Sequence, residues 1–228
     1  MLALSLELAQ HQFEQSPALS SVPIGKPIGI LVLLGFAAEG IWRLARHIGV
    51  IAHEGAHALA GWSMGHKIVR VELKSDGSGE TVIGGPMSSL GVVITSFAGY
   101  MGPSLFGLGA AALLAHHQVE AVLIMAGIAL FLMLLLVRNS FGCISVLLNG
   151  GVIFLVLRYG NVEIETIAAY ALSWFLLLSG VRFVLMPGSW LGDSETLSKT
   201  THIPRVVWIA LWLASALLAL WIGGHLLV

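Results

Sequence analysis

The chain has 228 residues, of which 57% are hydrophobic and only 10% are charged, and its formal net charge is −1. A soluble domain usually carries about 25% charged residues, so this chain has too few polar side chains to cover a surface that faces water. The composition excludes a disordered chain, a nucleic-acid-binding protein with a basic face and a soluble enzyme. The single cysteine, Cys143, excludes an internal disulfide framework and a CxxC metal site, and the length fits one domain.

The N-terminal segment, residues 1–23, is expected to be an amphipathic lead-in rather than a signal peptide, because Glu7 and Glu14 interrupt its apolar run. Residues 27–42 (PIGILVLLGFAAEGIW) then form the expected first membrane span. We expect residues 24–228 to make up a single membrane-embedded domain.

Residues 53–57 read His-Glu-Gly-Ala-His, which is an HExxH motif. Positions i and i+4 of a helix share a face, so His53 and His57 can present their imidazole nitrogens to one metal ion. Glu54 lies about 100° around the helix axis, where it can act as general base on a zinc-activated water. Ionisable side chains in apolar helices are costly and are functional by default. The alternative is a hydrogen-bonded polar cluster without a metal.

A polar segment follows the motif. Within it, Val69, Val71 and Leu73 alternate with charged residues and precede an Asp-Gly turn, which predicts a β-hairpin at about residues 67–85. An exposed hairpin edge can bind an unwound substrate as an added strand. We expect this edge at residues 82–85, where Gly84 and Gly85 permit close approach of another backbone; the alternative is a plain connecting turn.

Five further stretches contain no Asp, Glu, Lys or Arg, and their high apolar density indicates membrane spans. They are residues 81–119, 121–137, 139–157, 166–181 and 206–228. We therefore expect an all-α polytopic membrane protein with six to seven membrane helices and a small β-hairpin. It is expected in the lipid bilayer, by default the plasma membrane of a bacterium, and the sequence does not indicate its oligomeric state.

A catalytic zinc site needs a third protein ligand beside one open position. Asp193 follows an apolar run, and its spacing suits either this ligand or a helix N-cap. Because one Zn²⁺ with Glu54 and Asp193 sums to zero charge, burial in the membrane favours Asp193. Asp76 lies in the turn of the hairpin, where Asp-Gly is ordinary turn chemistry. The other candidates are Glu39, His66, His116, His117 and His202.

Topology permits this ligand set. By the positive-inside rule, Lys67, Arg70 and Lys74 place the hairpin in the cytosol. Counting the later spans from that side returns Asp193 to the same side, as a shared metal site requires. Upstream two readings stay open, because only twelve uncharged residues separate Glu54 from Lys67. The HExxH helix is either a partial insertion or a full crossing.

The chain resembles the site-2-protease clan of intramembrane zinc metalloproteases, peptidase family M50, and within it the compact M50B-like branch. The resemblance covers residues 51–212. It is carried by HEGAH, by the hairpin (VRVEL…SGETVIGGP) and by the phrases AGYMGPSLFG, VRNSFG and GDSETLSKTTHIPRVVWIALW. No PDZ-like insertion is present.

The resemblance implies a zinc ion held by His53, His57 and Asp193, with Glu54 as general base. The better-known members place their Asp in an Asn-Pro-…-Leu-Asp-Gly phrase, which this chain lacks, so Asp193 is matched through the Asp phrase of the compact branch.

These observations together predict an intramembrane zinc metalloendopeptidase that hydrolyses membrane-protein substrates. Asn139 is expected either to donate a hydrogen bond to the developing oxyanion or to cap a helix at the interface. The alternative function is a non-proteolytic membrane protein that binds metal for transport or acts as a chaperone. A purely structural metal site has no need of Glu54, which favours the protease.

Overall fold

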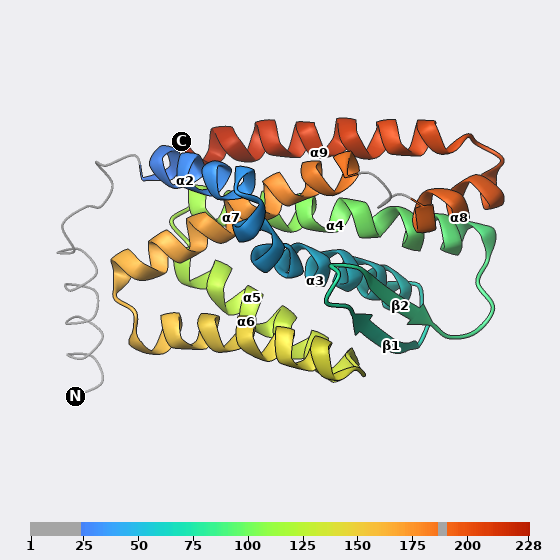
Figure 1. Cartoon of the computed structure of the whole chain (residues 1–228), viewed down its shortest axis with the longest axis horizontal. Helices are drawn as coiled ribbons and strands as arrows, with labels where there is room; N and C mark the ends of the chain where they lie inside the picture. Colours follow the sequence, from blue (N-terminus) through green and yellow to red (C-terminus); the bar gives the residue numbers. More distant parts are fainter. Residues whose placement is uncertain (1–23, 187–190) are drawn as a thin grey trace, which may run out of the picture.

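The computed structural model describes residues 24–186 and 191–228, so the expected lead-in over residues 1–23 lies outside the described residues. The described part contains eight helices and one two-stranded sheet (Figure 1). The helices are α2 (Gly25–Ala37), α3 (Glu39–Ser63), α4 (Ser89–Ala115), α5 (Val119–Leu136), α6 (Ser140–Tyr159), α7 (Val162–Leu185), α8 (Leu191–Thr201) and α9 (Arg205–Leu227). The strands are β1 (Ile68–Leu73) and β2 (Gly79–Ile83).

Five of the described helices, α4, α5, α6, α7 and α9, are long and apolar enough to cross a membrane. The bent pair α2 and α3 passes the same test together, which gives up to six spans among the described residues. The prediction of an all-α polytopic membrane protein is therefore confirmed. A count of six is reached only if the bent pair is one span, and the described helices do not supply a seventh.

The expected first span over residues 27–42 is not straight, because the chain bends by 107° between α2 and α3. Ala38 is extended at the bend. The Arg182 guanidinium of α7 donates to the Phe36 carbonyl at the end of α2 and, at 3.1 Å, to the Glu39 carboxylate at the start of α3. It also lies 4.2 Å from the ring centre of Trp42. The Arg182 side chain thus provides a hydrogen-bond partner for the end of α2 and for the start of α3. Composition alone does not reveal this partner.

The predicted hairpin is confirmed: β1 and β2 pair antiparallel, with Val71 opposite Thr81 and Leu73 opposite Gly79. The outer edge of β1 is covered by the segment between α5 and α6. Val137 forms a parallel bridge with Val71, and the Arg138 amide donates to the Val71 carbonyl at 3.0 Å. This cover leaves the outer edge of β2 as the open edge of the hairpin.

The bent pair connects the two ends of the molecule. A side chain at Gly25, where α2 begins, would collide with the carbonyl of Leu227, where α9 ends. In Figure 1 this end lies at the left, and the hairpin and α8 lie at the right. Since α3 leads directly into the hairpin, the pair α2 and α3, rather than the HExxH helix alone, runs from one end to the other.

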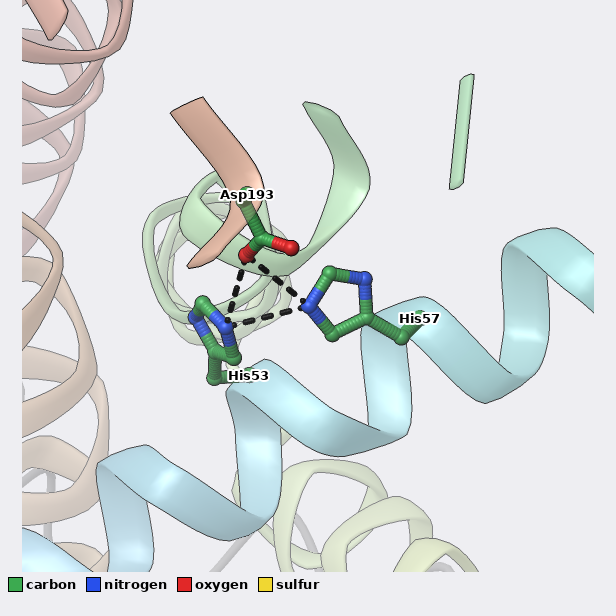
Figure 2. Close-up of side chains that lie close together, drawn as sticks. All are labelled: His53, His57 and Asp193. Carbon is green, nitrogen blue, oxygen red and sulfur yellow. Dashed lines mark hydrogen bonds and ion pairs between the residues drawn. The ribbon is translucent and has the colours of Figure 1, made fainter. Parts of the chain in front are cut away.

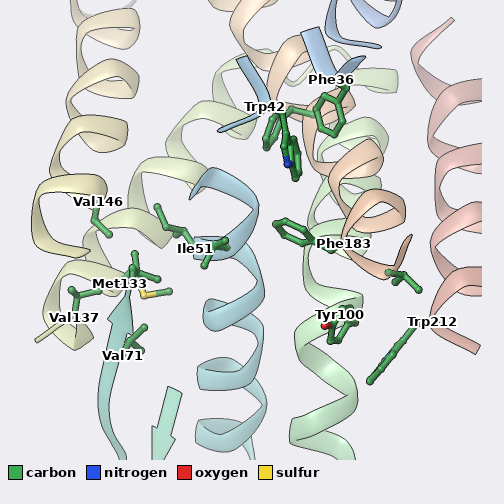
Figure 3. Close-up of a cluster of buried hydrophobic side chains, with 14 of the residues drawn as sticks. Phe36, Trp42, Ile51, Val71, Tyr100, Met133, Val137, Val146, Phe183 and Trp212 are labelled. Atoms are coloured by element: carbon green, nitrogen blue, oxygen red, sulfur yellow. The ribbon is translucent and has the colours of Figure 1, made fainter. Parts of the chain in front are cut away.

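A buried apolar cluster fixes α3 between its neighbours (Figure 3). On one side Ile51 packs in a cluster with Val71 of β1 and Met133 of α5. On the other side of α3, Phe183 of α7 and Tyr100 of α4 continue the same cluster. Between membrane helices such packing is stabilised by van der Waals contacts, so the helix with the motif is held on several sides.

Candidate metal centre

The two histidines of the motif project from one face of α3, as their spacing requires. Their Nε2 atoms lie 3.1 Å apart, and the rings meet almost at right angles, with centres 4.7 Å apart. Figure 2 shows that both rings point toward the same place, beside the start of α8. Two imidazole nitrogens therefore converge before any third residue is considered.

Asp193 reaches these nitrogens from the first turn of α8, 136 positions further along the chain than His57. Its Oδ2 atom lies 3.3 Å from Nε2 of His53 and 3.2 Å from Nε2 of His57 (Figure 2). Burial raises the pKa of Asp193, but hydrogen bonding and charge from the two histidines outweigh it and hold the pKa well below its usual range. Asp193 is therefore a carboxylate at neutral pH, as a metal ligand must be.

A backbone carbonyl of α4 fixes the orientation of His57. Nδ1 of His57 donates to the Thr95 carbonyl at 2.7 Å. This hydrogen bond fixes the ring with Nδ1 as the donor, so Nε2 is the nitrogen directed at Asp193 and His53. Metal-binding histidines generally donate their second ring nitrogen in this way.

Gly99 allows α4 to approach the two rings. A Cβ atom at this position would lie 2.2 Å from Nε2 of His57 and 2.8 Å from Nε2 of His53. The next residue, Tyr100, presents its ring edge-on to His53 with the centres 4.8 Å apart and stacks on Trp212 of α9 at 4.3 Å. On the face of α4 next to the two rings, Gly99 therefore has no side chain, and Tyr100 contacts His53 with a ring that Trp212 holds in place.

Glu54 is buried, with 4% of its surface exposed, and its carboxylate faces the hairpin. The Thr81 hydroxyl donates to Oε2 of Glu54 at 2.6 Å and lies 3.2 Å from the Glu54 carbonyl oxygen. A Cβ atom at Gly79 would lie 2.4 Å from Oε1, so glycine leaves room for the carboxylate. Glu54 thus stands beside the cluster of three without belonging to it.

A cavity of about 490 Å³ is lined by the three side chains of the cluster, His53, His57 and Asp193, and by Glu54. Its wall also includes Gly79, Thr81 and Ile83, so β2 borders the site directly. The described lining residues include no Lys or Arg, and the charged ones are acidic: Glu54, Glu80 and Asp193. An acidic cavity with two converging imidazoles is suited to a cation.

The other predicted site residues lie elsewhere. Asn139 donates from Nδ2 to the Leu73 carbonyl at 2.6 Å and accepts from the Leu73 amide at 3.1 Å, so its amide is joined to the backbone of β1. Gly84 donates to the Lys67 carbonyl at 2.8 Å, and Gly85 has a positive φ of 85° at the exit from the hairpin. None of these three lines the cavity. The strand that does is Gly79–Ile83, slightly earlier than the expected residues 82–85.

The alternative third ligands do not join the cluster. Within the described ranges, His53, His57 and Asp193 are the one group of three such residues whose ligand atoms lie within 4.8 Å of one another. Asp76 accepts from the Ser78 hydroxyl at 2.6 Å in the hairpin turn, and this bond lowers its pKa. Glu39 pairs with Arg182. The remaining candidates are outside the group: His66, His116, His117 and His202.

Four residues of the site escaped the sequence analysis: Gly79, Thr81, Thr95 and Gly99. Each acts through a contact with α3 across 25 to 46 positions, counted to Glu54, His57 or His53. The sequence gives only a weak signal for them. Gly79 and Thr81 share one face of the predicted strand, and Gly99 lies in an apolar helix.

Comparison with known proteins identifies the family of the chain. Comparison with curated proteins and with solved structures finds no match. A family model described as Peptidase M50B-like matches residues 28–223, which is most of the chain and includes the HEGAH motif and Asp193. The chain therefore belongs to the M50B-like peptidase family.

Proposed function

We propose that this protein is an intramembrane zinc metalloendopeptidase. The observation that carries the proposal is the triangle formed by Nε2 of His53, Nε2 of His57 and Oδ2 of Asp193, with sides of 3.1 to 3.3 Å. Family membership and five candidate membrane spans support a peptidase in the membrane. Substrates are expected to be membrane proteins, and the plasma membrane of a bacterium is the proposed location.

The triangle has the dimensions that zinc requires. Ligand atoms at about 2.0–2.1 Å from a tetrahedral zinc ion lie about 3.3 Å from one another. Two imidazoles and one carboxylate form a common ligand set of catalytic zinc sites and leave the fourth position open. With Glu54 beside it, the site would carry no net charge when loaded, which limits the cost of burial in the membrane.

The residues around the triangle suit peptide hydrolysis. A bound zinc ion supplies a Lewis acid that polarises the peptide carbonyl and makes water acidic enough to be activated at neutral pH. Glu54 takes a proton from the attacking water and passes it to the leaving amine. His57 keeps its ligand nitrogen in place through the Thr95 carbonyl. The predicted oxyanion role of Asn139 gains no support, because its amide is joined to β1.

The open edge of β2 is the proposed binding site for the substrate backbone. Ladder bonds join Ser78 with Lys74 and Gly84 with Lys67 at the two ends of the hairpin. Antiparallel alternation between these ends turns the backbone N–H and C=O groups of Gly79, Thr81 and Ile83 to the outer edge. These three residues line the cavity together with Glu54. An unwound substrate added as a strand would therefore lie beside the base.

The test compares wild type with Glu54→Gln in membranes, with bound zinc and cleavage of a single-span substrate as the two readouts. The proposal predicts about one zinc per chain in both and loss of cleavage in the variant, because Gln cannot accept the proton. Equal cleavage by both proteins would reject Glu54 as the base. Zinc binding with no cleavage by either protein would favour the transport or chaperone alternative.

A second pair of variants tests the third ligand. Asp193→Asn should lower the zinc content, because a neutral amide is a poorer ligand and leaves the loaded site with a surplus positive charge. Asp76→Asn is the matched control and should retain zinc, because Asp76 bonds to Ser78 in the turn. The reverse result would overturn the assignment.

A further inference from the structure

Strand β2, which borders the cavity, presents one face to α3 and its free backbone edge to the substrate side. The face of β2 that carries the side chains of Thr81 and Ile83, and the bare backbone of Gly79, is turned to α3, where it adjoins Glu54 and Gly61. The backbone groups of these same residues face the open edge. Thr81 lies in the middle of this set and therefore connects α3 with the edge.

The Thr81 side chain is attached to Glu54 twice. Its hydroxyl lies 2.6 Å from the carboxylate oxygen Oε2 and 3.2 Å from the backbone carbonyl oxygen of the same residue. A hydrogen bond from a hydroxyl to a carboxylate is about twice as strong as one between neutral groups. Glu54 is 4% exposed, so water has little access to replace this donor.

The Thr81 hydroxyl is the side-chain donor that the structure gives to the Glu54 carboxylate. Gly79, on the same face of β2, contributes an absence of side chain: a Cβ atom there would lie 2.4 Å from Oε1. The carboxylate is thus confined between a donor at one oxygen and a bare backbone at the other. Its direction depends on where β2 lies.

We propose that Thr81 is a positioning residue that orients the Glu54 carboxylate through its hydroxyl, so that the strand to which substrate adds also sets the direction of the base. This inference rests on the proposed peptidase function. Adding a substrate strand to the edge of β2 would order the strand whose side chain holds Glu54. Substrate binding at the edge of β2 would then align the Glu54 carboxylate through Thr81.

The kinetic test uses Thr81→Val, which keeps the β-branched shape and removes the hydroxyl, and Thr81→Ser, which keeps the hydroxyl. Val69→Ala is the control in the same hairpin, because Val69 lies on β1, is exposed and does not line the cavity. Misalignment of a general base is expected to lower kcat about 10- to 100-fold in Thr81→Val, with KM within about two-fold of wild type. Thr81→Ser should recover most of kcat, Val69→Ala should keep kcat, and all three variants should keep one zinc per chain.

Several results would overturn the positioning role. They are an unchanged kcat in Thr81→Val, a loss of zinc in that variant, equal kcat in the two variants at Thr81, and an equal loss of kcat in Val69→Ala. Cleavage by wild type that does not depend on Glu54 would instead reject the proposed function. The two failures are therefore distinguishable.

A second measurement reads the contact without activity. Melting temperatures of the chelator-treated protein are compared for Thr81→Val, Glu54→Ala and the double variant. If the hydroxyl acts on Glu54, the fall in melting temperature caused by Thr81→Val should be smaller in the Glu54→Ala background than in wild type. Equal falls in both backgrounds would show that the two side chains are not coupled and would overturn the proposal.

Discussion

At the scale of single residues, Gly99 decides how closely α4 can approach the metal ligands. Gly99→Ala would place a methyl group 2.2 Å from Nε2 of His57, so either the ring or the helix must move. We predict loss of most bound zinc and of cleavage. Gly109→Ala is the matched control on the same helix, because no atom lies within 4 Å of its Cβ position. Zinc content equal to wild type in Gly99→Ala would contradict this geometry.

Sequence reasoning reached some residues of the site and not others, for a physical reason. His53, Glu54 and His57 follow from local spacing on one helix, because helix geometry fixes which side chains share a face. Asp193 lies on another helix, and charge balance and family resemblance were needed to select it. Gly99 and Thr81 act only through contacts between elements, and such contacts are set by packing that no local pattern encodes.

At the scale of elements, Asn139 joins the α5–α6 connection to the hairpin. It bonds to both backbone groups of Leu73, whose residue surface is 1% exposed. Asn139→Leu would leave a buried N–H and a buried C=O without their partner, at a cost of about 1–3 kcal/mol. We predict a lower melting temperature and faster amide hydrogen exchange in β1, with zinc content unchanged.

This variant also separates the two roles considered for Asn139. If Asn139 is a structural link, Asn139→Leu should change the melting temperature and the hydrogen exchange more than it changes kcat. A loss of kcat of a hundred-fold or more, with melting temperature and exchange unchanged, would instead restore the oxyanion role.

Among the elements, the hairpin could be predicted from the sequence, and the bend between α2 and α3 could not. Alternation of apolar and charged residues before an Asp-Gly turn defines a hairpin locally. The bend instead depends on Arg182, which lies 143 positions from Glu39 and bonds to both helix ends. Without that cation, residues 27–42 read as one continuous apolar span.

At the scale of the whole molecule, the site requires the hairpin and α8 to lie on one side of the membrane. In a Cys143→Ser background, single cysteines at Lys74 and Lys199 should react with a membrane-impermeant thiol reagent from the same side. A cysteine at Gly160, at the connection between α6 and α7, should react from the opposite side. Labelling of the Lys74 and Lys199 positions from opposite sides would contradict the arrangement.

The membrane class and the number of later spans were predictable because they depend on composition, which the bilayer constrains directly. The course of the HExxH helix was not, because its polar face removes the usual apolar signal. The contact of Gly25 with Leu227 and its hydrogen bond from Trp174 show that α2 begins at the far end of the molecule.

The central claim is that His53, His57 and Asp193 hold one zinc ion, and X-ray absorption at the zinc edge of the purified protein tests it most directly. We predict about one zinc per chain, with two imidazole ligands and oxygen ligands at about 2.0–2.1 Å, and loss of this spectrum in Asp193→Asn. A sulfur ligand at about 2.3 Å, which would implicate Cys143, or a spectrum unchanged in Asp193→Asn would contradict the account.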